Sequence, residues 1–175
     1  MKILPIIIIG TLIYFPAHSQ KDFLKWGDNV KIKWTDFKGE VETNSPFAAM
    51  SAVGIHYKYN SSIKGKLIKV SFDIDAAFDK TKSWSKKSQR SAGTLRHEQL
   101  HFDICEVVGR QFKKEAEKTV YSKNFKNEII RIFNRYTRYL QKFQKKYDDQ
   151  TRHSNNKLKQ KEWENLIRHE LLKKY

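Results

Sequence analysis

Apolar and polar residues alternate along parts of the first half of the chain. Ile32 and Trp34 form one short run with this period of two, and longer runs cover residues 53–59 and 68–74. Alternation of this kind is typical of strands that bury one face. The polar stretch at residues 60–66 separates the two longer runs and is typical of a hairpin connection. The pattern therefore predicts a small antiparallel sheet.

Beyond Trp84 the apolar residues recur every three or four positions, which is the period of a helix with one buried face. The spacing predicts one helix from residue 87 or 91 to residue 118 and another over residues 125–147. A polar loop at residues 148–156 and a last helix over residues 158–171 follow. This order, a sheet followed by three helices, predicts an α+β fold.

The first predicted helix contains the sequence HEQLH at residues 97–101, which matches the HExxH pattern of zinc peptidases. On a helix, His97 and His101 lie one turn apart on one face, so both imidazoles can reach a single Zn²⁺ ion. Glu98 projects about 100° away from His97, where it can hold a water without binding the metal. A small antiparallel sheet followed by this HExxH helix and two further helices is compatible with a compact zincin-like domain.

Catalytic zinc usually has three protein ligands, so the two histidines need a partner. The longer pattern HExxHxxGxxH is excluded, because Ile104 and Val107 occupy its glycine and histidine positions. His153, in the predicted polar loop, is our choice for the third ligand. His56, on a predicted strand, is a further candidate. A downstream carboxylate is the open alternative, and the candidates are Glu115, Glu117 and Glu128.

The N-terminal residues have the pattern of a secretory signal peptide. Lys2 precedes an apolar stretch at residues 3–15, and the small-residue sequence Ala-His-Ser ends at Ser19. We expect residues 1–19 to be a signal peptide cleaved near Ser19 and Gln20. The remaining residues, 20–175, suffice for a single domain with a hydrophobic core. The mature protein is then expected to be secreted or periplasmic.

Cys105 is the only cysteine in the chain, so no intrachain disulfide is expected. Its apolar neighbours favour a buried thiol over a metal ligand.

The chain is strongly basic, with a net charge of +16 that becomes +15 when residues 1–19 and the charge of Lys2 are removed. Such a charge attracts acidic partners in general. The rival hypothesis is therefore a basic, envelope-associated module that binds acidic polymers or proteins, including a zincin without catalytic activity. Peripheral contact with an anionic membrane fits the same charge. The aromatic residues follow one helical face, so we expect no specific nucleic-acid recognition.

Several stretches of the chain resemble a bacterial family of predicted secreted zinc-dependent proteases, domain of unknown function 922. The resemblance covers residues 34–39, 48–51, 83–84, 95–106 and 147–153, with Gln160 and Trp163. It implies a bacterial exported metallopeptidase in which His97 and His101 bind zinc and Glu98 is the base. The family's loop usually has glycine after its histidine. Here Ser154 stands at that position.

The leading hypothesis is thus a secreted zinc metallopeptidase that cleaves protein or peptide substrates. A zinc-activated water attacks the peptide bond, and Glu98 acts as general base. Tyr147 is a candidate for stabilising the oxyanion.

Overall fold

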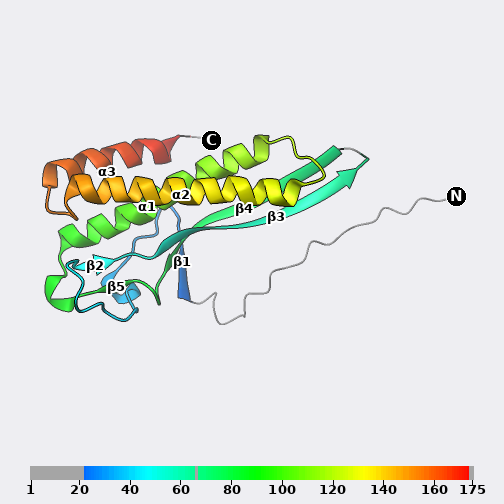
Figure 1. The fold of residues 1–175 in the computed structure, drawn as a ribbon. Coiled ribbons are helices and arrows are strands. Elements are labelled where there is room, and N and C mark those ends of the chain that lie inside the picture. The colour runs from blue at the N-terminus through cyan, green and yellow to red at the C-terminus, as the bar shows by residue number, and fades with distance from the viewer. Residues whose placement is uncertain (1–21, 66, 174–175) are drawn as a thin grey trace.

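The computed structural model describes residues 22–65 and 67–173. The predicted signal peptide lies outside these residues. The described chain forms a small antiparallel sheet followed by three long helices, which confirms the predicted α+β order (Figure 1). No helix within the described ranges is long and apolar enough to cross a bilayer.

Three antiparallel strands, in the order β1-β4-β3, make up the main sheet. They are β1 (Phe23–Lys25), β3 (Val53–Lys64) and β4 (Leu67–Asp79). The predicted hairpin loop at residues 60–66 is wrong for most of its length, since Asn60 pairs with Ser71 and the pairing continues to Lys64 and Leu67. Polar residues persist there because the end of the hairpin is largely exposed to solvent, with Ser62, Ile63 and Lys64 exposed in succession.

A second, two-stranded sheet joins β2 (Ala49–Met50) to β5 (Trp84–Ser85). The run at Ile32 and Trp34 was predicted to be a strand, and this is wrong, because residues Trp34–Asp36 form a short 3₁₀ turn. Another 3₁₀ turn, Lys87–Gln89, precedes the first helix. The two short strands lie beside the N-terminal end of that helix (Figure 1).

The helices are α1 (Ala92–Lys118), α2 (Phe125–Thr151) and α3 (Lys157–Leu172). The Ser91 side chain begins α1 by accepting a hydrogen bond from the Thr94 amide at 3.0 Å. Helix α2 is longer than predicted and includes the start of the expected polar loop.

Helix α1 is the central element, because it contacts the sheet as well as α2 and α3. Its core side chains are fully buried, and Phe112 contacts Tyr57 of β3 and Phe133 of α2. Cys105 is also fully buried, as predicted, and is a free thiol. His97 and His101, at the two ends of the HExxH sequence, therefore lie on a buried helix in the middle of the fold.

Candidate metal centre

The residues of the HExxH sequence lie in the first half of α1 with their side chains buried. His97, Glu98 and His101 are only 3%, 4% and 7% exposed. The imidazole rings of the two histidines are 4.9 Å apart and nearly perpendicular. Polar groups that are buried this deeply need partners. The structure supplies these partners from α2 and α3, which are remote in sequence.

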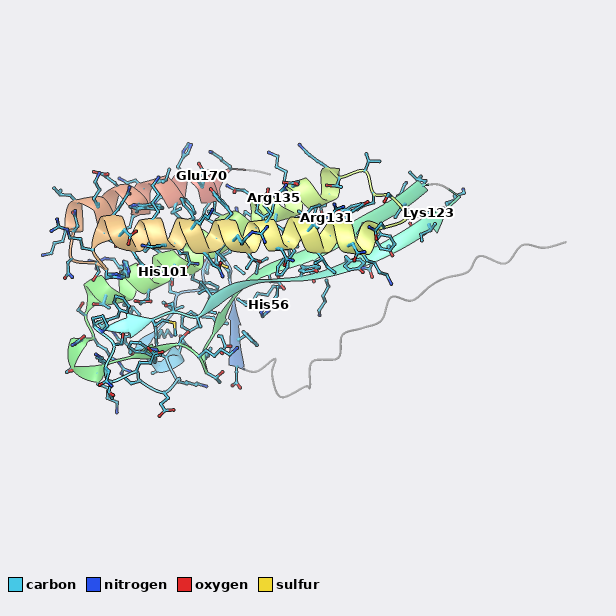
Figure 2. All side chains as sticks on the ribbon, viewed as in Figure 1. His56, His101, Lys123, Arg131, Arg135 and Glu170 are labelled. Atoms are coloured by element: carbon cyan, nitrogen blue, oxygen red, sulfur yellow. The ribbon has the colours of Figure 1, made fainter. Side chains whose placement is uncertain are left out.

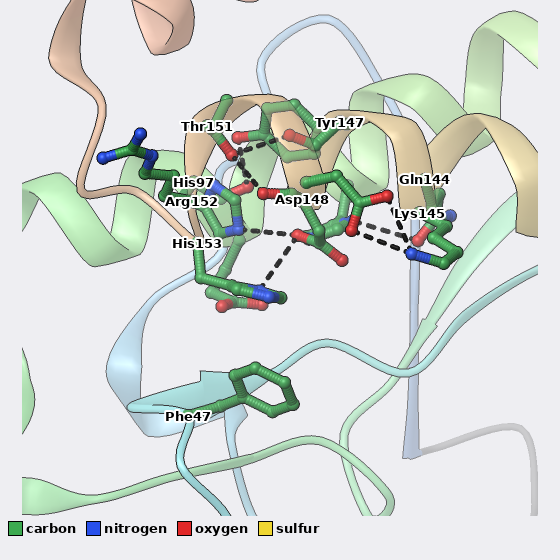
Figure 3. A network of polar contacts seen from close by, with 12 residues as sticks. Phe47, His97, Gln144, Lys145, Tyr147, Asp148, Thr151, Arg152 and His153 are labelled. Carbon is green, nitrogen blue, oxygen red and sulfur yellow. Dashed lines mark hydrogen bonds and ion pairs between the residues drawn. The ribbon is translucent and has the colours of Figure 1, made fainter.

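Asp148 of α2 faces both histidines. Its Oδ1 atom lies 3.0 Å from Nε2 of His97 and 3.0 Å from Nε2 of His101 (Figure 3). Among the described residues, these three side chains form the group whose donor atoms could share a metal ion. Donor atoms on one tetrahedral zinc lie about 3.3 Å apart, given bonds of roughly 2.0–2.1 Å. The two distances from Asp148 to the histidines are therefore close to those of a zinc site.

Sequence reasoning missed Asp148 because the helix was ended at residue 147. The structure shows that the helix continues to Thr151. Thr151 follows Tyr147 by four residues, and both are fully buried, so the buried stripe of α2 continues past Asp148. The Thr151 hydroxyl donates to the Tyr147 carbonyl at 2.7 Å, as expected within a helix.

The hydrogen-bond partners of the Gln160 amide indicate which ring nitrogen of His97 donates. Oε1 of Gln160 accepts from the Tyr147 hydroxyl at 2.9 Å, and Nε2 donates to Glu164 at 3.4 Å. The same Oε1 lies 3.1 Å from Nδ1 of His97, so Nδ1 is the nitrogen that donates. In a neutral imidazole, Nε2 then faces the Asp148 carboxylate as a second acceptor. Two acceptors in contact need a proton or a cation between them, and this donor set fits a divalent metal.

His101 has a similar partner on its other ring nitrogen. Its Nδ1 lies 3.0 Å from Oε1 of Gln144, which is one turn before Asp148 on α2. Histidines that bind a metal through one nitrogen usually donate from the other to a fixed acceptor. Gln144 and Gln160 thus orient the two imidazoles.

The charges of the centre perturb its acid–base behaviour in the metal-free protein. Burial alone would raise the pKa of Asp148, but hydrogen bonds from His101 and His97 hold that pKa well below its ordinary value. Burial would lower the pKa of His101, but the bond to Asp148 raises it above its ordinary value. A proton held between these groups competes with a metal for the same position. Metal affinity is therefore expected to fall as the pH falls.

Tyr147 packs against the His97 ring and donates a hydrogen bond to Gln160. Its side chain is fully buried and stacks on the His97 ring at a centroid distance of 4.6 Å. Burial is the largest of the effects that raise the pKa of its hydroxyl far above the ordinary value. Because this hydroxyl bonds Gln160 and is closed off from solvent, the predicted role in stabilising an oxyanion is wrong. Tyr147 instead holds Gln160 and the His97 ring in place.

His153 lies at the open edge of the centre, outside the three-residue cluster. Its Nδ1 is 3.6 Å from Oδ1 of Asp148, and its side chain is 45% exposed. The Phe47 ring packs against the His153 ring in a tilted arrangement, with the ring centroids 4.3 Å apart (Figure 3). Phe47 ends the segment of residues 40–47, which lines an open hollow on the surface. His153 as a zinc ligand stays a prediction, and Asp148 is the alternative third ligand that lies beside both histidines.

The other sequence candidates lie elsewhere. Glu115 and Glu128 are separated from His101 and Asp148 by about 21 and 30 Å along their helices. Their carboxylates bind other partners, namely Arg135 for Glu115 and Ser122 for Glu128. Glu117 lies 3.9 Å from Lys113 on the same helix. His56 packs against Phe23 on the sheet and is labelled apart from His101 in Figure 2. The structure therefore brings none of the four to the centre.

The turn that carries His153 has an unusual backbone. Arg152, His153 and Ser154 have φ angles of 49°, 50° and 72°, so all three are left-handed. A residue with a side chain pays a penalty of about 1 kcal/mol in this conformation, which glycine avoids. The usual glycine of the family loop would thus fit the backbone found at Ser154.

We expect Ser154→Gly to raise the free energy of unfolding by about 0.5 kcal/mol, because relief of strain exceeds the added entropy of the unfolded chain. Urea unfolding of the metal-free protein measures this change. The control, Asn165→Gly at an exposed position within α3, should lower the free energy by about the same amount. A destabilised Ser154→Gly protein would contradict the assigned conformation.

One of three comparisons with known proteins gave a match. The sequence profile of a family described as a bacterial protein of unknown function (DUF922) matches residues 31–154. These residues include the HExxH sequence, Asp148 and His153. A search of curated proteins found no match, and a search of solved structures found none. Because the profile matches well over half of the sequence, the chain belongs to the bacterial family DUF922.

Proposed function

We propose that the protein is an exported zinc-dependent peptidase with a zincin-like active site. The observation that carries the proposal is the convergence of His97, His101 and Asp148 on one point, with Glu98 beside the first histidine. Two neutral imidazoles and one carboxylate are a common ligand set for catalytic zinc, which keeps a further position open. The export signal predicted at residues 1–19 supports a function outside the cytoplasm.

The roles of the residues follow from their surroundings. Zinc, when bound, supplies a Lewis acid that polarises a substrate carbonyl and lowers the pKa of water. Glu98 is one residue from His97, and its charge contributes to raising the pKa of His101, so the carboxylate lies near the centre. From there Glu98 accepts a proton from the attacking water and passes it to the leaving amine. Gln144 and Gln160 keep the imidazoles oriented throughout.

The test is cleavage of a mixed peptide library by the purified protein, followed by mass spectrometry. Treatment with a zinc chelator should reduce cleavage by about 100-fold or more, and one equivalent of Zn²⁺ should restore it. Elemental mass spectrometry on the same samples reports the zinc content. A folded protein that binds zinc but cleaves no peptide would refute the peptidase proposal, and one that binds no zinc would refute the centre itself.

A second candidate function, binding of an acidic polymer, is favoured by the surface of α2. Cations on α1 and α3 commonly pair with acids, as Arg110 does with Glu106 and Lys159 with Glu162. On α2, several exposed cations form no ion pair with any described residue. They lie within a narrow arc of the helix and are Arg131, Arg138, Lys142 and Lys146. Figure 2 shows Arg131 and Arg135 along this helix.

Metal-free protein would then bind heparin, as a model polyanion, with an affinity that falls steeply with salt. The matched control replaces Arg138, Lys142 and Lys146 by glutamate, which leaves the metal centre unchanged. Equal retention of both proteins on a heparin column would rule out this surface.

A further inference from the structure

Ser51 connects the β2 strand to the proposed catalytic base. This residue lies between β2 and β3, and its hydroxyl donates to Oε2 of Glu98 at 2.6 Å. Ser51 is half-buried, whereas Glu98 is 4% exposed. A hydroxyl–carboxylate hydrogen bond of this length is charge-assisted and strong. The contact joins residues that are 47 positions apart in the chain.

The backbone around Ser51 is held by the turn between β4 and β5. The Ala52 amide donates to Oγ of Ser83 at 2.9 Å, and the Asp79 amide donates to the Ala52 carbonyl at 2.8 Å. The Ser83 hydroxyl donates in turn to the Asp79 carbonyl at 2.6 Å, and Ser83 is fully buried. Two bonds thus fix the residue next to Ser51 to a rigid turn.

Gly39 extends the same support on the other side of Ser83. Its amide donates to the Ser83 carbonyl at 2.8 Å. A Cβ atom at position 39 would lie 2.8 Å from the Thr81 carbonyl oxygen and 2.9 Å from that of Ser83. Only glycine lets the two backbones approach this closely. Gly39 and Ser83 thus support the segment that presents Ser51 to Glu98.

We propose that Ser51 is a positioning residue for Glu98. By binding Oε2, Ser51 fixes the carboxylate plane and leaves Oε1 to accept the proton of the attacking water. The inference rests on the proposed peptidase function. It gives Ser51, which directly follows β2, a role in positioning the base of that site. The competing explanation is that Ser51 only satisfies a buried carboxylate. That explanation predicts a loss of stability without a specific loss of turnover.

The test is the steady-state kinetics of Ser51→Ala on a peptide that the wild-type protein cleaves. We expect kcat to fall by about 10- to 100-fold with KM within about twofold, because a misplaced base slows the proton transfer but leaves substrate binding intact. Zinc content should stay near one per protein. Ser51→Thr keeps the hydroxyl and should recover most of kcat. Ser71→Ala, at an exposed serine of β4, is the matched control and should behave as wild type.

Ser51→Cys is a second variant in case the alanine variant fails to fold. Cysteine keeps the shape of the side chain, but its thiol is only a weak hydrogen-bond donor to Glu98. The kcat of this variant should also fall. Wild-type kcat in folded Ser51→Ala or Ser51→Cys would overturn the role of Ser51, while the peptidase proposal would still stand on Glu98. Full activity in Glu98→Gln would instead overturn the peptidase proposal itself.

Discussion

The Asp148→Ala protein should no longer hold zinc, because the substitution removes the carboxylate that faces both histidines at 3.0 Å. We expect the zinc dissociation constant to rise by at least about 100-fold, since two imidazoles alone are a poor site. Competition titration against a chromophoric chelator measures the constant, and elemental mass spectrometry gives the zinc content. Asp148→Asn, which keeps the shape of the side chain, should also weaken binding and shows whether the charge is what matters.

His153→Ala is the matched comparison, since this histidine is 3.6 Å from the same carboxylate oxygen but nearly half exposed. It should keep zinc near one per protein. Retention of zinc in Asp148→Ala together with its loss in His153→Ala would reverse the assignment and make His153 the third ligand.

Glu98→Gln should abolish peptide cleavage while zinc stays bound. The amide cannot accept the proton of the attacking water, and loss of a general base typically costs about 10²- to 10⁴-fold in rate. The substitution does not alter His97, His101 or Asp148, so metal content should equal that of the wild type. Single-turnover cleavage of a fluorogenic peptide, with zinc measured on the same sample, separates the two effects.

Glu106→Gln provides the control for Glu98→Gln. Glu106 lies two turns further along α1, where it pairs with Arg110 at 2.8 Å, away from the centre. Its rate of cleavage should stay within about twofold of the wild type, as expected for a substitution without contact to the site. An equal loss of activity in both variants would indicate a general effect of charge or stability rather than a base at position 98.

Local patterns predicted the parts of the fold that depend on local periodicity. The helical period placed His97 and His101 on one buried face of α1, and the apolar neighbours of Cys105 indicated a buried thiol. Both main errors had the same cause. The strands of the hairpin run on through Asn60 and Ser62, and α2 runs on through Asp148, although these residues are polar. A polar residue ends a helix or strand only where the backbone loses its hydrogen-bond partners. In both of these segments the backbone hydrogen bonds continue.

The residues of α2 and α3 that complete the centre could not be predicted from local sequence patterns. Gln144 and Gln160 are ordinary helix residues in the sequence, and their importance comes from contacts with histidines 43 and 63 positions away. The same holds for Ser51, whose partner lies on another element. Residues that orient a metal ligand or a base follow no sequence motif, because they reach their partners only through the packing of distant segments of the chain.

The ligands come from two antiparallel helices, and this has a consequence for the durability of the protein. A zinc ion bound by His101 and Asp148 would close a chain segment of roughly 50 residues, as a disulfide does, which restricts the unfolded chain by about 4 kcal/mol. The only cysteine is a buried free thiol, so the ion would be the sole covalent-like link between the helices within the described chain. Resistance to proteolysis would then depend on the concentration of free zinc, and removal of zinc would expose the chain to proteases.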